Sequence, residues 1–209
     1  MKQRDYWDQV ADTKNFTTPF HSEIFAKYVG KDAYILDLGC GYGRTLKELQ
    51  ELGYKNLHGI DFSEKMIKRG KKENASLDLK IMKSKDIDLP DQSVEAVILF
   101  AVLTCITKNE DQEYLIKEIR RVLKPHGIVY VNDFLLNNDD RNIARYEAFA
   151  EKLGVYGAFE LSEGAICRHH DEKWIRELFS SFHVDKMEHI TFTTMNGHMS
   201  NGFYLVGEK

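Results

Sequence analysis

The stretch Ile35-Leu36-Asp37-Leu38-Gly39-Cys40-Gly41-Tyr42-Gly43-Arg44 decides the fold of this chain. An apolar run typical of a strand ends in an acid, alternating glycines follow, and a helical pattern begins after them. Glycine adopts positive φ and lets a ligand approach the backbone closely, because it has no Cβ. The free amides at the start of the helix would face the same loop. The stretch therefore predicts a binding loop for a nucleotide-type ligand.

Apolar runs and amphipathic patterns alternate on both sides of this loop. We expect strands at 33–38, 56–60, 77–82, 94–100 and 127–134, and helices at 42–52, 64–72 and 111–123. This order predicts a parallel sheet with helices on both faces. A further helix is expected at 172–179 and strands at 184–194 and 203–206. Asn196-Gly197 and Asn201-Gly202 flank the connection between these last strands, which is typical of an antiparallel hairpin.

Composition limits the class of protein. The 209 residues are enough for one domain with a full core, and neither a repeat nor a flexible linker indicates a second. The net charge of −4 and the lack of a basic block argue against nucleic-acid binding. No apolar run reaches membrane-spanning length, and the polar start is unlike a signal peptide. Three scattered cysteines fit a reducing compartment. We therefore expect a cytoplasmic monomer or homodimer with no nucleic-acid or membrane partner.

Chemistry-bearing residues fall where the predicted strands end, which is where ligands bind in parallel sheets. The first group is the glycine loop, and the second is Asp61, about 20 residues further on. A carboxylate at this place can accept hydrogen bonds from ribose hydroxyls. Asp86 can accept one from an adenine amino group, with Ile87 packed on the base, and Phe100 leaves the fourth strand.

On these residues the chain resembles the class I S-adenosylmethionine-dependent methyltransferases. The resemblance rests on ILDLGCGYG, GIDFSEKMI, KDIDLPDQSVEAVILF and EIRRVLKPHGIVYVNDF, which lie in this order between residues 35 and 134. It implies an α/β, Rossmann-like fold with a seven-stranded sheet, helices on both faces and an antiparallel C-terminal hairpin. It also implies S-adenosyl-L-methionine as the cofactor and S-adenosyl-L-homocysteine as its product.

The resemblance also implies roles for single residues. Asp37, Gly39 and Gly41 would hold the amino acid end of the cofactor. Asp61 would bind the ribose, and Phe100 would line the sulfonium side. The complete set expected at the cofactor is Asp37, Gly39, Cys40, Gly41, Tyr42, Asp61, Phe62, Asp86, Ile87, Phe100, Tyr6 and Trp7.

Two segments outside the shared motifs are expected to hold the methyl acceptor. Residues 1–30 carry aromatic side chains and would form a helical lid; the alternative is an amphipathic helix packed on the sheet. Residues 135–170 are too many for a bare connection and would form an inserted substrate-side segment. The substrate candidates are Arg145, Tyr146, Tyr156 and Asp133, and arginines 141, 145 and 168 would suit an anionic acceptor.

A general base is the least certain part of the site. His169 or His170 is the candidate, because imidazole titrates near neutral pH; the alternative is that both cap the following helix. His198, on the hairpin, is a third candidate. Methyl transfer from a sulfonium requires alignment and exclusion of water more than acid–base chemistry. No His, Asp and Glu cluster has metal-ligand spacing, so no metal is expected.

The sequence therefore predicts a methyltransferase that acts on an oxygen or nitrogen atom of a small molecule, in a single domain spanning residues 1–209. One alternative is an NAD-dependent oxidoreductase. Its fingerprint is GxGxxG, whereas this loop has GxGxG with Arg44 in place of the third glycine. The other alternative is a non-catalytic S-adenosylmethionine-binding protein.

Overall fold

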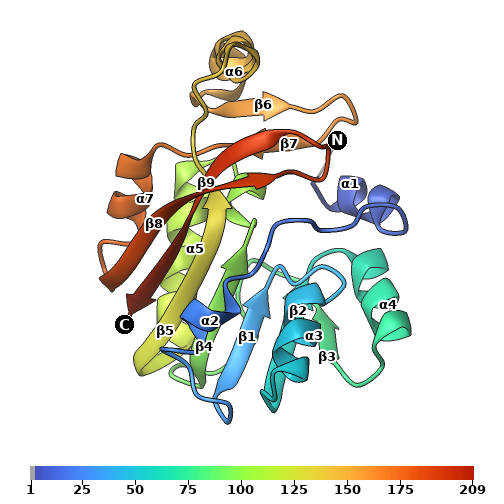
Figure 1. Ribbon diagram of the computed structural model, residues 1–209, viewed down its shortest axis with the longest axis vertical. Helices are drawn as coiled ribbons and strands as arrows, with labels where there is room; N and C mark the ends of the chain where they lie inside the picture. Colours follow the sequence, from blue (N-terminus) through green and yellow to red (C-terminus); the bar gives the residue numbers. More distant parts are fainter. Residues whose placement is uncertain (1–2) are drawn as a thin grey trace.

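The computed structural model describes residues 3–209, and one seven-stranded sheet runs through it (Figure 1). The strands of this sheet are β1 Tyr34–Leu38, β2 Asn56–Asp61, β3 Asp78–Ile81, β4 Val94–Phe100, β5 Leu123–Phe134, β8 His183–Thr193 and β9 Met199–Glu208. Their order is β3-β2-β1-β4-β5-β9-β8. Strand β9 is antiparallel to both β5 and β8. The predicted Rossmann-like sheet with a C-terminal hairpin is confirmed, and within that hairpin β9 alone runs against the other strands.

Helices cover both faces of the sheet. They are α1 Gln3–Val10, α2 Ser22–Phe25, α3 Arg44–Glu51, α4 Glu64–Glu73, α5 Asn109–Val122, α6 Asp140–Leu153 and α7 Glu172–Leu178, with a 3₁₀ turn at Leu103–Cys105. Ser63 caps α4 as the sequence predicts, and its hydroxyl oxygen accepts the N–H of Met66 at 3.2 Å. Of the helices in the described part of the chain, none is both long and apolar enough to span a membrane.

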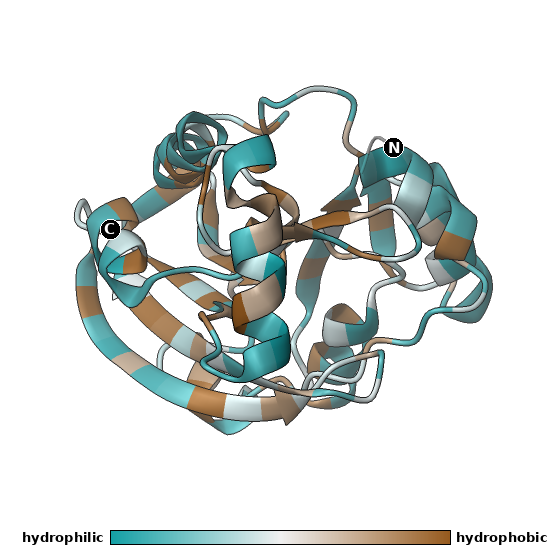
Figure 2. Cartoon of the chain, turned by 90° about the horizontal axis from the view of Figure 1, so that it is seen from above, coloured by the Kyte–Doolittle hydropathy of each residue, from teal (hydrophilic) through white to brown (hydrophobic). Residues whose placement is uncertain are grey.

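The hydrophobic core is divided into two layers by the sheet. Leu36 packs with α5 and α7 residues on one face, whereas its neighbour Ile35 packs with α2, α3 and α4 residues on the other. On β4, Val97 likewise packs in the first core layer and Ile98 in the second. Successive side chains of a strand point to opposite faces, so a continuous apolar run fills both layers. Figure 2 shows apolar residues concentrated along the strands and the inner sides of the helices.

The segment between β5 and α7 forms structure of its own. It contains α6 and a small antiparallel pair, β6 Ala158–Glu160 and β7 Ile166–Arg168, which lie beyond the end of the large sheet in Figure 1. At the other end of the chain, α1 lies beside α4. The Asp8 carboxylate accepts hydrogen bonds from the Ser63 hydroxyl at 2.6 Å and from the Lys65 N–H at 3.1 Å.

Strand β5 begins earlier than predicted. It starts at Leu123 and includes Pro125-His126-Gly127, which the sequence indicates as a turn before a strand at 127–134. The pairing with β4 shifts between Val94 and Ala96, and His126 has a φ of 61°. The predicted turn is thus an irregularity inside one strand.

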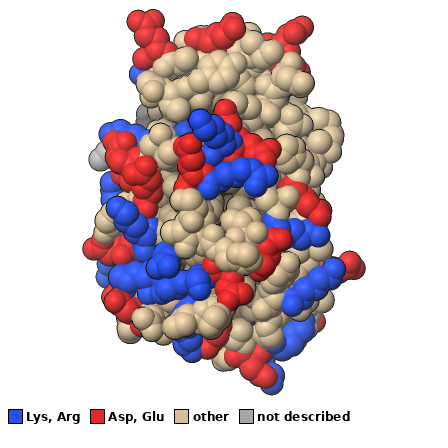
Figure 3. All heavy atoms as spheres, turned by 90° about the vertical axis from the view of Figure 1, so that its left-hand side faces the viewer, with Lys and Arg blue, Asp and Glu red and all other residues tan. Residues whose placement is uncertain are grey.

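On the face shown in Figure 3, basic and acidic side chains are interspersed.

Candidate active site

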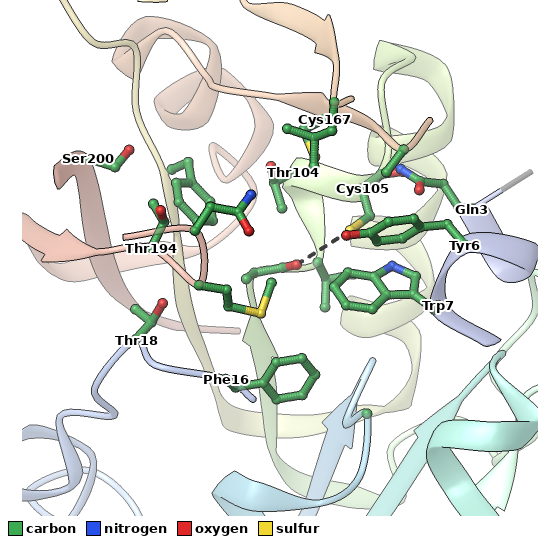
Figure 4. Close-up of a pocket in the computed structure, with 18 of the residues that line it drawn as sticks. Gln3, Tyr6, Trp7, Phe16, Thr18, Thr104, Cys105, Cys167, Thr194 and Ser200 are labelled. Carbon is green, nitrogen blue, oxygen red and sulfur yellow. Dashed lines mark hydrogen bonds between the residues drawn. The ribbon is translucent and has the colours of Figure 1, made fainter. Parts of the chain in front are cut away.

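A cavity of about 330 Å³ lies at the carboxyl ends of the strands. One part is lined by Gly39, Gly41, Asp61, Phe62 and Phe100, which all follow or end β1, β2 or β4. The other part is lined by residues of α6, the β6–β7 pair and the β8–β9 connection, and residues of α1 complete the lining. Figure 4 shows side chains from these distant segments converging on the same space. We call the first part the strand-end half and the second part the outer half.

The glycine loop has the shape that close ligand approach requires. Gly39 and Gly41 have φ values of 78° and 55°. A Cβ added to Gly39 would lie 2.5 Å from Cγ2 of Val102, and one added to Gly41 would lie 2.5 Å from the Phe16 ring. The N–H of Gly39 donates to the carbonyl oxygen of Ile60 at 2.8 Å, which ties the loop to the end of β2. Neither position has room for a side chain.

Asp61 connects the glycine loop to the start of α4. Its Oδ2 accepts the N–H of Gly41 at 2.9 Å, and its Oδ1 accepts the N–H of Ser63 at 2.7 Å. Burial raises the pKa of Asp61, while these two N–H groups act in the opposite direction. Each carboxylate oxygen has a second lone pair, so Asp61 can accept further hydrogen bonds from the cavity that it lines.

Asp37 lies behind the loop rather than on the cavity wall. It is 1% exposed, and its Oδ1 has no hydrogen-bond partner among residues 3–209. Burial, reinforced by the charge of Asp61, raises the pKa of Asp37 to about 7, and Arg44 opposes the shift. The Arg44 guanidinium lies 5.2 Å from the centre of the Phe100 ring. Asp37, the residue before the end of β1, is therefore a buried part of the support of the loop.

The residues predicted at the adenine are not on the cavity wall. Asp86 is exposed and accepts a hydrogen bond from the Tyr114 hydroxyl. Ile87 is buried in the core layer beside α5, and its N–H donates to Glu118 at 3.0 Å. In this structure the loop carrying them is anchored to α5, because Arg121 also donates to the Ile87 carbonyl oxygen at 2.8 Å.

Cys40 and Tyr42 also lie outside the cavity lining. Cys40 is buried in the core layer beside α3. The Tyr42 ring stacks on Phe16 with centroids 4.7 Å apart, and its hydroxyl accepts the Phe16 N–H at 3.0 Å. Tyr42 thus holds Phe16 against the glycine loop, and Phe16 itself lines the cavity.

The N-terminal helix forms one wall of the cavity. Tyr6 and Trp7 both line it, as predicted for side chains near the cofactor. The Tyr6 hydroxyl donates to Glu163 at 3.4 Å, and the side chain of Gln3 donates to the Cys105 carbonyl oxygen at 3.2 Å. Helix α1 therefore joins the inserted segment to the end of β4 across the cavity (Figure 4).

Of the four predicted substrate residues, Arg145 alone lines the cavity. Tyr146 is fully buried behind it, and Tyr156 is 49% exposed on the surface. Asp133 is buried and accepts the N–H groups of Thr104 at 3.2 Å and Phe134 at 2.8 Å. Burial raises the pKa of Asp133 to about 7. Asp133 therefore shapes the turn after β4 and does not reach the acceptor space.

The two adjacent histidines occupy different environments. His170 is fully buried away from the cavity lining; its Nδ1 lies 3.1 Å from the Phe134 carbonyl oxygen and its Nε2 lies 2.9 Å from the Gln112 side-chain nitrogen. Burial lowers the pKa of His170 to about 3. Both of its nitrogens are occupied, so the structure does not support the expectation that His170 is a base.

His169 does line the cavity, but it is held as a neutral ring. Its Nδ1 lies 2.6 Å from the Tyr146 hydroxyl and 3.1 Å from the Asn137 amide nitrogen. We assign Nδ1 as the acceptor, since the Asn137 N–H already donates to the Tyr146 oxygen at 3.3 Å. Burial and the charge of Arg145 lower the pKa of His169 well below its usual value. In this state the other ring nitrogen carries the proton, so His169 is a donor rather than a base.

Several lining residues lay outside the sequence-based site. Thr104, Cys105 and Cys167 line the cavity, although Cys105 reads from the sequence as a buried small residue. Ala101 lines it as well, with a φ of 55° that is rare for a side-chain-bearing residue. Thr104 and Cys105 could have been predicted only from their position shortly after β4. No sequence pattern places Cys167 of β7 at the cavity. Among residues 3–209, no group of three or more His, Cys, Asp or Glu is arranged to hold a metal.

Comparison with known proteins identifies the family. A family described as "Methyltransferase domain" matches residues 36–131, which include the glycine loop, Asp61 and the strand end at Phe100. A SAM-dependent methyltransferase structure from Methanosarcina mazei superposes with a TM-score of 0.84 at 26% identity, covering 89% of this chain and 96% of that one. Residues 36–131 therefore form a class I S-adenosylmethionine-dependent methyltransferase domain, and S-adenosylmethionine is the cofactor of this family. The NAD-dependent alternative is set aside.

Curated relatives share the domain but differ in their substrates. An eEF1A lysine and N-terminal methyltransferase from Mus musculus is 26% identical over 60% of this chain and 19% of its own length. A sterol 24-C-methyltransferase from Aspergillus fumigatus is 30% identical over 69% of this chain and 41% of its own length. A carboxy-S-adenosyl-L-methionine synthase from Shewanella woodyi is 29% identical over 58% of this chain and 52% of its own length. The chain thus spans about half or less of the length of these relatives, and their names point to no common acceptor.

Proposed function

We propose that this protein transfers the methyl group of S-adenosylmethionine to an oxygen or nitrogen atom of a small molecule that binds in the outer half of the cavity. The observation that carries the proposal is the continuity of the cavity. The same space is lined by the glycine loop and by Arg145 and His169 of the inserted segment. A cofactor at the strand ends and an acceptor in the outer half would therefore meet inside one enclosure.

The strand-end half suits the cofactor in shape and in charge. Gly39 and Gly41 leave the backbone open where a side chain has no room. Asp61 is preorganised by two backbone N–H groups and retains lone pairs for the ribose hydroxyls. Phe62 and Phe100 provide apolar walls, and Tyr6 and Trp7 close the cavity from the side of α1. We propose these seven residues, all of them expected from the sequence, as the cofactor contacts.

The protein's part in the reaction is alignment and exclusion of water. When bound, S-adenosylmethionine would supply an activated methyl group, whose transfer to a lone pair of the acceptor would leave the electron pair of the S–CH₃ bond on sulfur. The cavity walls fix the line along which this exchange occurs. Helix α1 and the β6–β7 pair, joined by Tyr6 and Glu163, cover the site from solvent.

The adjacent histidines are not well placed to act as the base. His169 is kept neutral and donating, and Asp133 and His170 lie outside the cavity. His198, the third candidate from the sequence, does line the cavity, and its imidazole is the base that we propose for an acceptor that carries a proton. An acceptor atom with a free lone pair would need no base.

Calorimetric titration of the intact chain with S-adenosylhomocysteine tests the cofactor assignment. We expect one site per chain, and absence of binding by the folded protein would refute the proposal. Transfer from methyl-labelled cofactor to a panel of small molecules tests catalysis. If the product binds but no member of a broad panel is labelled, the non-catalytic binding protein becomes the better hypothesis.

A further inference from the structure

We propose, on the basis of the function above, that the methyl acceptor is an anion with an apolar body, and that Arg145 binds its charged group. Arg145 lies on α6 and lines the outer half of the cavity. Its guanidinium carbon lies 3.4 Å from the centre of the Phe159 ring, which holds the side chain flat against an aromatic wall. The guanidinium is thus fixed in direction before any ligand arrives.

The charge of Arg145 is not neutralised by the described protein. Its Nε is buried and has no hydrogen-bond partner among residues 3–209, and no ion pair joins Arg145 to a carboxylate there. Burial lowers the pKa of this arginine; the adjacent Tyr146 hydroxyl opposes the shift, and the charge of Arg141 reinforces it. A half-buried cation without a carboxylate partner is costly, and an anionic ligand would offset the cost.

The arginines that could bind an anion are separated by the structure. Arg168 is buried, but its Nη1 donates to the Thr107 carbonyl oxygen at 2.9 Å and to Asn109 at 2.7 Å, and it does not line the cavity. Arg141, one turn before Arg145 on α6, lines both the cavity and the adjoining outer hollow. It is 4.0 Å from Asp139 and half-exposed. We place Arg141 at the entrance and Arg145 at the binding position.

The electrostatic surroundings favour an anion. The charged side chains on the described cavity wall are Asp61, Arg141 and Arg145, and Asp61 belongs to the strand-end half. The outer half therefore carries positive charge alone, between walls that include Phe134, Phe159 and Leu161. Apolar walls strengthen the field of a fixed charge, and a planar guanidinium matches the two oxygens of a carboxylate or phosphate.

The neutral state of His169 is consistent with this arrangement. Arg145 lowers the pKa of His169, so the ring does not compete with the anion by becoming a second buried cation. With Nδ1 accepting from Tyr146, the proton of the ring is on Nε2 and can be donated to an anionic oxygen. The same pair of residues thus presents one cation and one neutral donor.

The experiment compares matched charged and neutral probes on the protein saturated with S-adenosylhomocysteine. Benzoate, phenylacetate and hexanoate are titrated against their neutral amides, with phenyl phosphate and inorganic phosphate as further arms, by ligand-observed NMR. We expect at least one anion to bind roughly tenfold or more tightly than its amide. The carboxylate and phosphate arms distinguish which anionic group the site prefers.

The variant Arg145→Gln should weaken binding of that anion by roughly 10- to 100-fold and leave its amide unaffected. Arg145→Lys, which keeps the charge but loses the planar fork, should give an intermediate loss. Arg120→Gln, which removes an exposed arginine on α5, is the matched control and should change neither.

Equal affinities for every anion and its amide, or an Arg145→Gln protein that binds the anion as the wild type does, would overturn the inference. The affinity for S-adenosylhomocysteine separates this failure from a failure of the proposed function. If the wild type binds the product and Arg145→Gln binds it equally well, the cofactor site is intact and only the acceptor assignment is at stake.

Discussion

The two halves of the cavity are built in opposite ways. In the strand-end half, the N–H of Gly41 donates to Oδ2 of Asp61 at 2.9 Å, and both residues belong to one continuous βαβ unit. In the outer half, Arg145, His169 and Ser200 come from α6, from the end of β7 and from β9. The first half is fixed by the backbone and by short-range hydrogen bonds, whereas the second depends on the packing of segments that are remote in sequence.

This difference teaches where each kind of specificity lies. A glycine loop has few alternatives once β1 and α3 are in place, because positive φ and the absence of Cβ define its path. The outer half is adjustable, since its walls are side chains on an inserted segment and a hairpin. The following predictions test whether substitutions in one half of the cavity change cofactor binding without changing acceptor binding. They run from the largest expected effect to the smallest.

Gly39→Ala should cause the largest loss of cofactor binding. The new Cβ meets Val102 at 2.5 Å in a residue with a φ of 78°, so backbone strain and steric overlap add to roughly 2–5 kcal/mol. We expect the affinity for S-adenosylhomocysteine, measured by calorimetry, to fall at least thirtyfold. Gly53→Ala is the matched control: its φ is 90°, but nothing lies within 4 Å of the added Cβ. It should lower stability by about 1 kcal/mol and leave the affinity unchanged.

A Gly39→Ala protein that is folded by circular dichroism and binds normally would remove the glycine loop from the cofactor site. The strand-end half could then no longer be described as a cofactor site fixed by the glycine loop. Loss of binding in both glycine variants would instead indicate a general effect of positive-φ substitution.

Asp61→Ala should weaken cofactor binding by roughly 1–3 kcal/mol, about one to two orders of magnitude in affinity. It removes the acceptor for the Gly41 and Ser63 N–H groups as well as the predicted ribose contact. Asp61→Asn should weaken cofactor binding less, because the amide keeps one carbonyl oxygen that can accept a hydrogen bond. An unchanged dissociation constant in the alanine variant would mean that Asp61 supports structure only. Affinity for an acceptor-site anion should not change in either variant.

His170→Ala should lower the free energy of unfolding by roughly 1–3 kcal/mol without changing cofactor affinity. The substitution removes two side-chain hydrogen bonds, one to the Phe134 carbonyl oxygen and one to the Gln112 amide, from a fully buried position. The backbone N–H of residue 170 still donates to Phe134, and Gln112 still donates to Leu103, so neither group is left without a partner. Urea denaturation measures the first quantity and calorimetry the second. The adjacent His169→Gln is the contrasting variant, since it alters a cavity-lining donor. A catalytic loss confined to His170→Ala at full stability would return His170 to the list of bases.

The pH dependence of stability should reflect Asp37. Its pKa is about 7 in the folded protein and 3.8 in the reference state, so the native state retains a proton that the unfolded chain releases. The free energy of unfolding should therefore fall as pH rises from about 4 to about 7. Asp37→Asn lacks this titration and should lose less stability over the same interval, by on the order of 1 kcal/mol.

Denaturation of both proteins at pH 5 and pH 8 provides the measurement. Asp88→Asn, at an exposed carboxyl group, is the control and should keep the wild-type slope. Identical slopes in the wild type and Asp37→Asn would show that the folded protein does not retain the Asp37 proton over this interval.

The sequence predicted the parallel part of the sheet well. Strand β4 has the predicted bounds, Val94–Phe100, and Ser63 caps α4 as expected. These successes rest on local signals: an unbroken apolar run, a hydroxyl before a helix, a glycine where φ is positive. The early start of β5 was missed, because a Pro-His-Gly stretch inside a strand has the same local signature as a turn.

The site was predicted unevenly, for a related reason. Asp61 and Phe100 line the cavity because a residue at the end of a parallel strand has little choice of position. Asp86 and Ile87 follow a strand too, but their loop is bound to Glu118 and Arg121 of α5, a contact that no local pattern reveals. Adjacent histidines looked equivalent in the sequence, and the chain folds one toward the cavity and one into the core.

The sequence by itself determined the class of fold and predicted the strand ends where we propose that the cofactor binds, since hydrophobic periodicity and glycine spacing act over a few residues. The tertiary structure alone decided which polar residues face the acceptor. It buries Tyr146 and Asp133, exposes Tyr156, and leaves Arg145 on the cavity wall. The physical reason is that burial depends on neighbours that folding brings together from separate elements, such as Phe159 against Arg145 and Thr104 against Asp133. The loop from Asp37 to Gly43 indicates what is bound there, and the packing around Arg145 indicates what can meet it.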